Sequence, residues 1–176
     1  SLANESDTTL GKSLGSMDTQ VSRMERLISD LLWLSRIESV EGERKEDQIN
    51  MVALLSDVQE GISAAWPNRE IHLNVSTDQR ILGSAIELRS AIDNLLVNAL
   101  KYSEGPVTLS WAETVVGPAM AIEDTGPGIE SKHIPRLTER FYRVDKSRSQ
   151  ATGGTGLGLA IVKHVAVSHE AKLFVD

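Results

Sequence analysis

Three stretches of this sequence combine small, polar and charged residues at spacings that a packed core does not require. The most glycine-rich is residues 153–164, GGTGLGLAIVKH, where four glycines precede a helical pattern of apolar residues. Backbone amides in such a loop, together with the dipole of the following helix, favour an anion such as phosphate. A plain tight connection would use the same glycines, and the stretch lacks the features of a Walker or a Rossmann loop. The role of residues 153–164 therefore has to be inferred together with the other two stretches.

The second stretch is a predicted helix over residues 87–102, ELRSAIDNLLVNALKY. Asn94 and Asn98 are four residues apart and share one helical face, although asparagine is a poor helix former. One interpretation is helix packing in which neighbouring groups satisfy both amides. The other is a site in which an asparagine oxygen binds a hard cation such as Mg²⁺, Lys101 lies near phosphate and Tyr102 lies against a base.

The third stretch follows a predicted strand over residues 119–124 and reads DTGPGI. Asp124 at the strand end can accept a hydrogen bond from an exocyclic amine, and the glycines after it let a flat ring approach the backbone. An Asp-Gly turn without a ligand would have a similar sequence. Taken alone, this motif leaves both interpretations open.

Residues 131–152 form a long, polar and basic segment around the aromatic pair Phe141 and Tyr142, with the cationic residues Arg136, Arg140, Arg143, Lys146 and Arg148. A segment of this length with weak periodicity is typical of a functional loop or lid. The alternative is a solvated basic helix with Phe141 tucked inward. We expect His133 and His72 to be surface residues.

The N-terminal part of the chain contains a predicted helix over residues 17–39. Met17, Val21, Met24, Ile28 and Leu31 recur at steps of four and three, which is typical of a coiled-coil seam. Either a partner chain covers this seam or the helix folds back on the rest of the molecule, and its width favours a partner in a helical bundle. We expect a loop over residues 1–16, a charged linker over 41–47 and a domain boundary near residue 42.

The rest of the chain alternates helical and strand patterns. A second amphipathic helix is predicted over residues 49–66, followed by strands at 71–75, 107–111 and 119–124, and residues 172–175 could begin another strand. These elements predict an α+β domain, a two-layer α/β sandwich with a mixed sheet on one side and helices on the other.

Composition narrows the classes of function. The chain has 176 residues and a net charge of −7, which argues against a general nucleic-acid binder. It has no cysteine, so neither disulfides nor a thiolate metal site is expected. No apolar run approaches the length that spans a bilayer, so we expect this stretch of chain to be soluble.

Taken in their order along the chain, the asparagine helix, the DTGPGI turn, the basic segment and the glycine-rich loop resemble the ATP-binding domain of sensor histidine kinases, within the superfamily that includes gyrase, Hsp90 and MutL. NLLVNALKYS is similar to the family's N box, DTGPGI to its first glycine box, ERFYR to its phenylalanine box and GGTGLGLAIVKH to its second glycine box. The resemblance covers residues 17–176 and implies a Bergerat-type ATP-binding fold that uses ATP and Mg²⁺. Residues 133–149 and 152–164 most resemble the branch of the family that serves the phosphate regulon.

The resemblance also implies roles for individual residues. Asn98 would hold Mg²⁺ with support from Asn94, Lys101 would meet a phosphate, and Tyr102 would pack beside the adenine. Asp124 would receive the adenine amino group in a pocket shaped by Gly126, Gly128 and Ile129. Tyr142 and Arg143 would approach the nucleotide, with Arg143 near the terminal phosphate as the catalytic residue. The phosphate tail would be capped by Gly154, Thr155, Gly156, Leu157 and Gly158.

The same resemblance implies partners. In the family, a histidine on a dimerisation hairpin takes the phosphoryl group and passes it to an aspartate of a response regulator. Residues 17–39 resemble the second hairpin helix, and none of the four histidines matches the phosphoacceptor, so we expect that this chain cannot phosphorylate itself and lacks the family's last strands. The intact protein would be a homodimeric inner-membrane receptor with this portion in the cytoplasm. An ATPase or serine kinase of the same superfamily and a nucleotide-gated interaction module remain alternatives.

Overall fold

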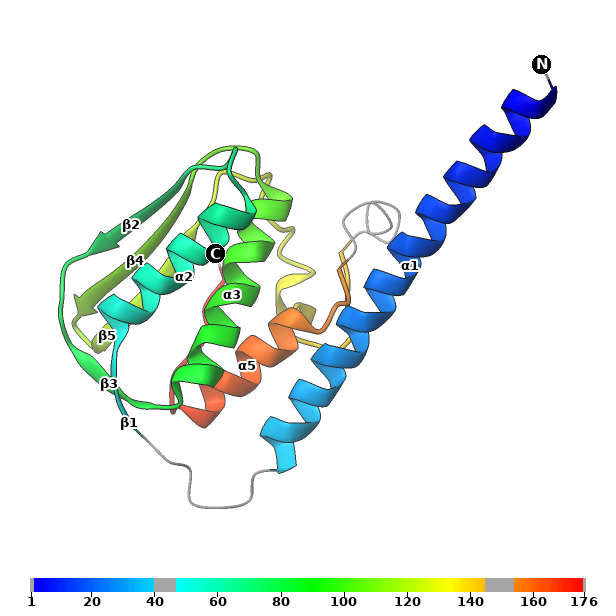
Figure 1. Ribbon diagram of the computed structural model, residues 1–176. Coiled ribbons are helices and arrows are strands. Elements are labelled where there is room, and N and C mark those ends of the chain that lie inside the picture. Colours follow the sequence, from blue (N-terminus) through cyan, green and yellow to red (C-terminus); the bar gives the residue numbers. More distant parts are fainter. Residues whose placement is uncertain (1, 40–46, 145–153, 176) are drawn as a thin grey trace.

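The computed structural model describes residues 2–39, 47–144 and 154–175 (Figure 1). A three-stranded mixed sheet forms one layer, from β2 (Ile71–Val75), β4 (Val107–Thr114) and β5 (Gly117–Glu123). The central strand β4 pairs in parallel with β2 and antiparallel with β5. A separate two-stranded antiparallel ribbon joins β1 (Asp47–Asn50) to β3 (Arg80–Gly83).

Helices α2 (Met51–Ala65) and α3 (Ala85–Tyr102) form the second layer and cover one face of the sheet (Figure 1). The alternate residues Val107, Leu109 and Trp111 of β4 are buried, as the period of two in a strand requires. They join one core cluster with Leu55 and Leu96, whose side chains are fully buried. The predicted α+β two-layer sandwich with a mixed sheet is therefore confirmed.

Local signals explain where the two covering helices begin and end. The Asn50 side chain accepts a hydrogen bond from the amide of Ala53, at 3.2 Å, and so caps α2. Ser84 caps α3 in the same way by accepting from the amide of Glu87, at 3.4 Å. Helix α2 ends shortly before Pro67, because proline cannot continue a helix.

Helix α5 (Gly158–Ser168) packs beside α3, and a second hydrophobic cluster holds them together with the long helix α1 (Leu2–Ser39). This cluster contains Leu34 of α1, Ala91 of α3 and three buried side chains of α5, namely Ile161, Val162 and Val165. Most of α1 extends beyond the remainder of the molecule (Figure 1). None of the helices in the described part of the chain is long and apolar enough to span a membrane.

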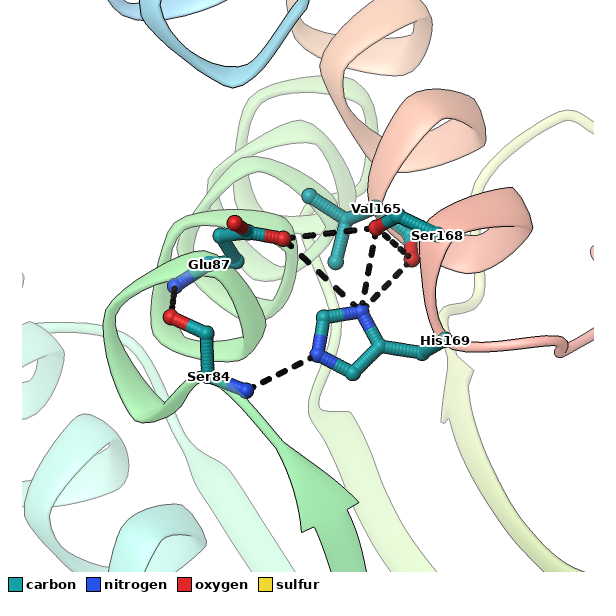
Figure 2. Close-up of polar contacts among 5 residues, drawn as sticks. All are labelled: Ser84, Glu87, Val165, Ser168 and His169. Atoms are coloured by element: carbon teal, nitrogen blue, oxygen red, sulfur yellow. Dashed lines mark hydrogen bonds and ion pairs between the residues drawn. The ribbon is translucent and has the colours of Figure 1, made fainter. Parts of the chain in front are cut away.

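Polar contacts also fix α3 against α5 (Figure 2). The buried His169, just after α5, accepts at Nε2 from the Ser84 amide, at 3.0 Å. Its Nδ1 lies 2.8 Å from the Val165 carbonyl oxygen, and the Ser168 hydroxyl donates to Glu87 Oε2 at 3.3 Å. These contacts join the first turn of α3 to the last turn of α5, and both helices carry candidate site residues.

Several sequence predictions were wrong in detail. Residues 2–16 belong to α1 rather than to a loop, because the cost of Gly11 and Gly15, about 1 kcal/mol each, does not stop a helix that the following turns already stabilise. Residues 49–50 belong to β1, so the second helix begins at Met51. Residues 171–175 contain no strand and pair with none of the described strands. The predicted linker over 41–47 lies outside the described residues except for Asp47.

The structure covers only part of the apolar surface of α1. Leu34 is buried against α5, so part of the helix does fold back on the domain. The five seam residues are exposed, with 65% of Met17 and 53% of Ile28 accessible. The partner surface and the domain boundary near residue 42 therefore stay predictions.

Candidate nucleotide-binding site

The candidate site is built around the second half of α3. Asn94, Asn98 and Lys101 are half-buried, whereas Tyr102 at the end of the helix is 53% exposed. Asn94 donates from Nδ2 to the Ser90 carbonyl at 2.8 Å, which leaves its Oδ1 directed elsewhere. That oxygen lies so close to Gly158 that a Cβ atom there would stand 2.5 Å from it. The structure thus brings Asn94 of α3 against Gly158, the first residue of α5.

The end of α3 is held by a side chain from outside the helix. Arg69, just before β2, donates to the carbonyl oxygen of Leu100, to the Ser103 hydroxyl at 3.2 Å and to the Gly105 carbonyl at 3.0 Å. A cation at a helix C-terminus satisfies carbonyl groups that have no partner within the helix. This contact fixes the turn that carries Lys101 and Tyr102.

The DTGPGI turn packs against that same end of α3. Asp124 Oδ1 accepts from the Gly126 amide at 2.7 Å, and its side chain is exposed. A Cβ atom at Gly126 would lie 2.8 Å from the Tyr102 carbonyl oxygen, so only glycine permits this approach. Gly128 has φ +72°, which glycine adopts without strain, and Ile129 is 40% exposed. The carboxylate therefore has a second oxygen that this hydrogen bond does not use.

The glycine-rich loop contacts the basic segment through Gly154 and Gly156. Arg143 donates from Nη1 to the Gly154 carbonyl at 2.5 Å, and a Cβ atom at Gly154 would be 3.9 Å from the Tyr102 hydroxyl. The Phe141 amide donates to the Gly156 carbonyl at 2.8 Å, with φ +64° at Phe141 and +75° at Gly156. Within 131–144 only Ile134–Arg136 forms a helical turn, of the 3₁₀ type, so those described residues do not form the alternative basic helix.

Cationic side chains gather near Lys101. Burial is the main cause that lowers the pKa of Lys101, followed by repulsion from Arg26 and Arg143, while Asp30 acts in the opposite direction. Asp30 also accepts from the Thr155 hydroxyl at 2.7 Å, and that hydroxyl accepts from the Leu157 amide at 3.3 Å. An anion near Lys101 would relieve this repulsion.

Sequence reasoning missed the contributions of α1 and of one histidine. Asp30 and Arg26 lie more than 120 positions before Thr155, so no local pattern links them to the glycine loop. His133, expected on the surface, is half-buried, and its Nδ1 lies 2.6 Å from the Tyr142 hydroxyl. The expectation for His72 is confirmed, since half of its side chain is exposed.

The hollow lined by Arg136, Glu139, Arg140, Phe141, Tyr142 and Arg143 has a volume of about 300 Å³. It contains Tyr142 and Arg143 but no residue of α3 or of the DTGPGI turn. Within the described residues, no group of three or more His, Asp or Glu side chains could hold a metal ion. A cation at this site would therefore depend on asparagine and on oxygens of a ligand.

Comparison with known proteins agrees with this geometry. Residues 83–176, just over half of the chain, match the family described as histidine kinase-, DNA gyrase B- and HSP90-like ATPases. The phosphate regulon sensor protein PhoR of Pseudomonas aeruginosa is 43% identical over 94% of this chain, which spans only 38% of that relative.

Two solved structures share the fold. The mycobacterial sensor histidine kinase MprB is 29% identical with a TM-score of 0.62, over 71% of this chain and 80% of that one. Full-length ShkA in complex with AMPPNP is 30% identical with a TM-score of 0.68, over 81% of this chain and 30% of that one. The two-layer sandwich is thus the Bergerat fold of histidine kinase ATP-binding domains, and the chain belongs to the histidine kinase-, DNA gyrase B- and HSP90-like ATPase family.

Proposed function

We propose that this chain is the ATP-binding catalytic portion of a two-component sensor histidine kinase. The observation that carries the proposal is the convergence of four motifs at the end of α3: the asparagine face, the exposed Asp124, the Arg143–Gly154 contact and the glycine loop. ShkA, a similar protein, was solved in complex with AMPPNP, which supports nucleotide binding at the corresponding fold. The reaction would move the γ-phosphoryl group of ATP to a histidine and then to an aspartate of a response regulator.

Asp124 would recognise the base. One carboxylate oxygen accepts from the Gly126 amide, and the second can accept a hydrogen bond from the amino group of adenine. Guanine presents a carbonyl oxygen where adenine carries this amine, so a carboxylate acceptor favours adenine. The exposed ring of Tyr102 would pack beside the base, in a pocket shaped by Gly126, Gly128 and Ile129.

Lys101 and Arg143 would bind the phosphates. Burial, followed by repulsion from Arg26 and Arg143, lowers the pKa of Lys101, and a bound phosphate would favour its protonated form. Backbone amides of residues 154–158, which lead into α5, add donors that need no side chain. Arg143 would lie near the terminal phosphate and stabilise the negative charge that develops there during transfer.

Asn98 would hold Mg²⁺, with Asn94 supporting it from the same helical face. A carboxamide oxygen is a suitable ligand for this hard cation, which usually takes most of its other ligands from phosphate and water. When bound, the ion would neutralise phosphate charge. The Asn94–Ser90 hydrogen bond, at 2.8 Å, fixes one amide on that face before any ligand arrives.

The physiological setting is also part of the proposal. Names of similar proteins, including the phosphate regulon sensor protein PhoR, support a role in phosphate-starvation signalling. The acceptor histidine would come from the dimerisation hairpin, of which α1 would be the second helix, with the domain boundary near residue 42. The intact protein would be a homodimeric inner-membrane receptor with this part in the cytoplasm.

Calorimetric titration tests the ATP site. We expect binding of ATP by the parent chain to depend on Mg²⁺ and to weaken at least tenfold in Asn98→Ala and in Asp124→Asn, because each loses a contact to a charged or metal-bound group, worth about 1.5–3 kcal/mol. Asp124→Asn should also reduce the preference for ATP over GTP. His72→Asn, on the exposed side of β2, is the matched control. A folded parent chain that binds no ATP would overturn the proposal.

A nucleotide-gated interaction module is the second candidate. It is favoured by the Asp30–Thr155 hydrogen bond, which connects α1 directly to the glycine loop. A phosphotransfer assay separates the two candidates, using this chain, Mg-ATP and a separate polypeptide that carries the acceptor hairpin helix. Phosphorylation of that polypeptide supports the kinase, whereas nucleotide binding without any transfer supports the module.

A further inference from the structure

The basic segment contains a side-chain cluster around Tyr142 for which the proposed roles do not account. The Tyr142 hydroxyl lies 2.6 Å from His133 Nδ1, and the guanidinium carbon of Arg136 lies 4.2 Å from the centre of the Tyr142 ring. Arg136 is itself held by Glu139 through hydrogen bonds of 3.0–3.2 Å. Thus Tyr142 is fixed at its hydroxyl and over one face of its ring.

The residues on both sides of Tyr142 contact the glycine loop. Phe141 donates its amide to the Gly156 carbonyl at 2.8 Å, and Arg143 donates to the Gly154 carbonyl at 2.5 Å. Phe141 has φ +64°, a conformation that a bulky residue adopts only when its surroundings enforce it. The anchored tyrosine therefore stands between two residues that contact the glycine loop.

We propose that His133 is a positioning residue for the phosphate-binding end of the site, acting through Tyr142. By fixing the tyrosine hydroxyl, His133 holds Arg143 at the glycine loop, ready for the terminal phosphates of ATP. This inference rests on the proposed function, because it assigns His133 to the same nucleotide site. It predicts an effect on ligands that carry phosphates and none on the base alone.

Two substitutions at His133 separate the role of Nδ1 from the general presence of a polar side chain. In His133→Asn the amide group lies near the position of Nδ1, whereas in His133→Gln it lies near that of Nε2. Binding of Mg-ATP and of adenosine is measured by calorimetry for the parent, both variants and Tyr142→Phe, which removes only the hydroxyl. His72→Gln, which removes an exposed histidine from β2, is the matched control.

We expect His133→Gln and Tyr142→Phe each to weaken Mg-ATP binding about fivefold, as the loss of one hydrogen bond does, and to change adenosine binding less than twofold. The double variant should be no weaker than either single one, because both changes break the same bond. His133→Asn should recover most of the affinity. Tyr142→Phe keeps the ring and its packing, so parent-like Mg-ATP binding by this variant would overturn the inference even if His133→Gln does not fold.

Two results would overturn the inference while leaving the proposed function intact. One is parent-like Mg-ATP binding by folded His133→Gln and Tyr142→Phe. The other is an equal loss of Mg-ATP and adenosine, which would indicate a merely structural role. If the folded parent chain binds no Mg-ATP, the proposed function itself fails, and this inference fails with it.

Discussion

At the scale of single residues, Lys101 shows a conflict between stability and ligand binding. Burial and the neighbouring Arg26 and Arg143 lower its pKa. The protonated amine therefore costs stability in the protein without nucleotide, and an anionic ligand removes that cost. We expect Lys101→Met to raise the free energy of unfolding of the free protein and to weaken ATP binding about tenfold or more.

The pH dependence of unfolding tests whether protonated Lys101 lowers the stability of the free protein. A base whose pKa is lowered on folding binds fewer protons in the folded than in the unfolded state, so stability rises with pH in the alkaline range below its ordinary value of 10.5. At pH values below that range, the protonated amine lowers the stability by its full amount. Lys101→Met should remove this rise, measured by denaturant unfolding, whereas Lys163→Met at an exposed position of α5 should not. A parent chain whose stability falls through that range would contradict the argument.

Gly158 gives a second prediction at this scale, because it combines a favourable backbone change with an unfavourable contact. Alanine is a better helix former than glycine, but its Cβ atom at this position would lie 2.5 Å from Asn94 Oδ1. We expect Gly158→Ala to displace the Asn94 side chain and weaken Mg-ATP binding several-fold, with at most a small change in stability.

Gly61→Ala is the matched control for this prediction. Gly61 lies on the exposed side of α2, where the nearest neighbour of a Cβ atom would be the end of the Arg89 side chain, at 3.6 Å. It should stabilise the protein by about 0.5–1 kcal/mol and leave nucleotide affinity unchanged. Equal nucleotide affinity in both variants would show that Asn94 adjusts without loss.

At the scale of elements, α1 meets the domain through few residues. Leu34 is 3% exposed and packs with Ile161 and Val165 of α5, whereas Leu32 on the same helix is 58% exposed. We expect Leu34→Ala to weaken the docking of α1 by about 2–5 kcal/mol, the usual cost of removing a buried leucine. Leu32→Ala should change it by less than about 0.5 kcal/mol in the monomeric chain.

Hydrogen exchange and Trp33 fluorescence would measure this docking. Trp33 packs against the cluster that contains Leu34, so its emission should shift toward that of an exposed indole in Leu34→Ala. The amides of α2 and α3 should keep their protection, because most of the buried side chains of these helices lie in the other cluster, around Leu96 and Leu109. Loss of protection throughout the molecule would mean that α1 is part of one cooperative unit.

The elements also show what could be predicted from the sequence. The asparagine helix and strands β2, β4 and β5 were predicted because their periodicity and end signals are local. The ribbon of β1 and β3 was missed, since each strand has only four residues and becomes recognisable only through pairing with the other. The placement of Asn94, Asp124 and Gly158 around the end of α3 followed from resemblance, while the Asp30–Thr155 and His133–Tyr142 contacts depend on tertiary packing that no spacing encodes.

At the scale of the whole molecule, the two hydrophobic clusters imply two steps of unfolding. Leu88 is the only side chain that appears in both clusters among the described residues. The cluster around Leu34 is small, so we expect α1 to detach at a lower temperature than that at which the sheet and its covering helices unfold. Trp33 lies in the part around Leu34, and Trp66 and Trp111 both lie in the part around the sheet, so tryptophan fluorescence can report the two steps separately.

Mg-ATP should raise the upper transition, because the proposed ligand contacts α3, the turn after β5 and the start of α5 at once. A ligand at about one hundred times its Kd stabilises the folded state by about 2.7 kcal/mol, which for a chain of this size is a rise of roughly 5–10 °C in Tm. Asp124→Asn, with its weaker affinity, should show a smaller rise at the same ATP concentration. If Mg-ATP raised only the temperature at which Trp33 becomes exposed, the nucleotide would act on the contact between α1 and the glycine loop, where Thr155 donates to Asp30, and the proposed contacts along α3 would be wrong.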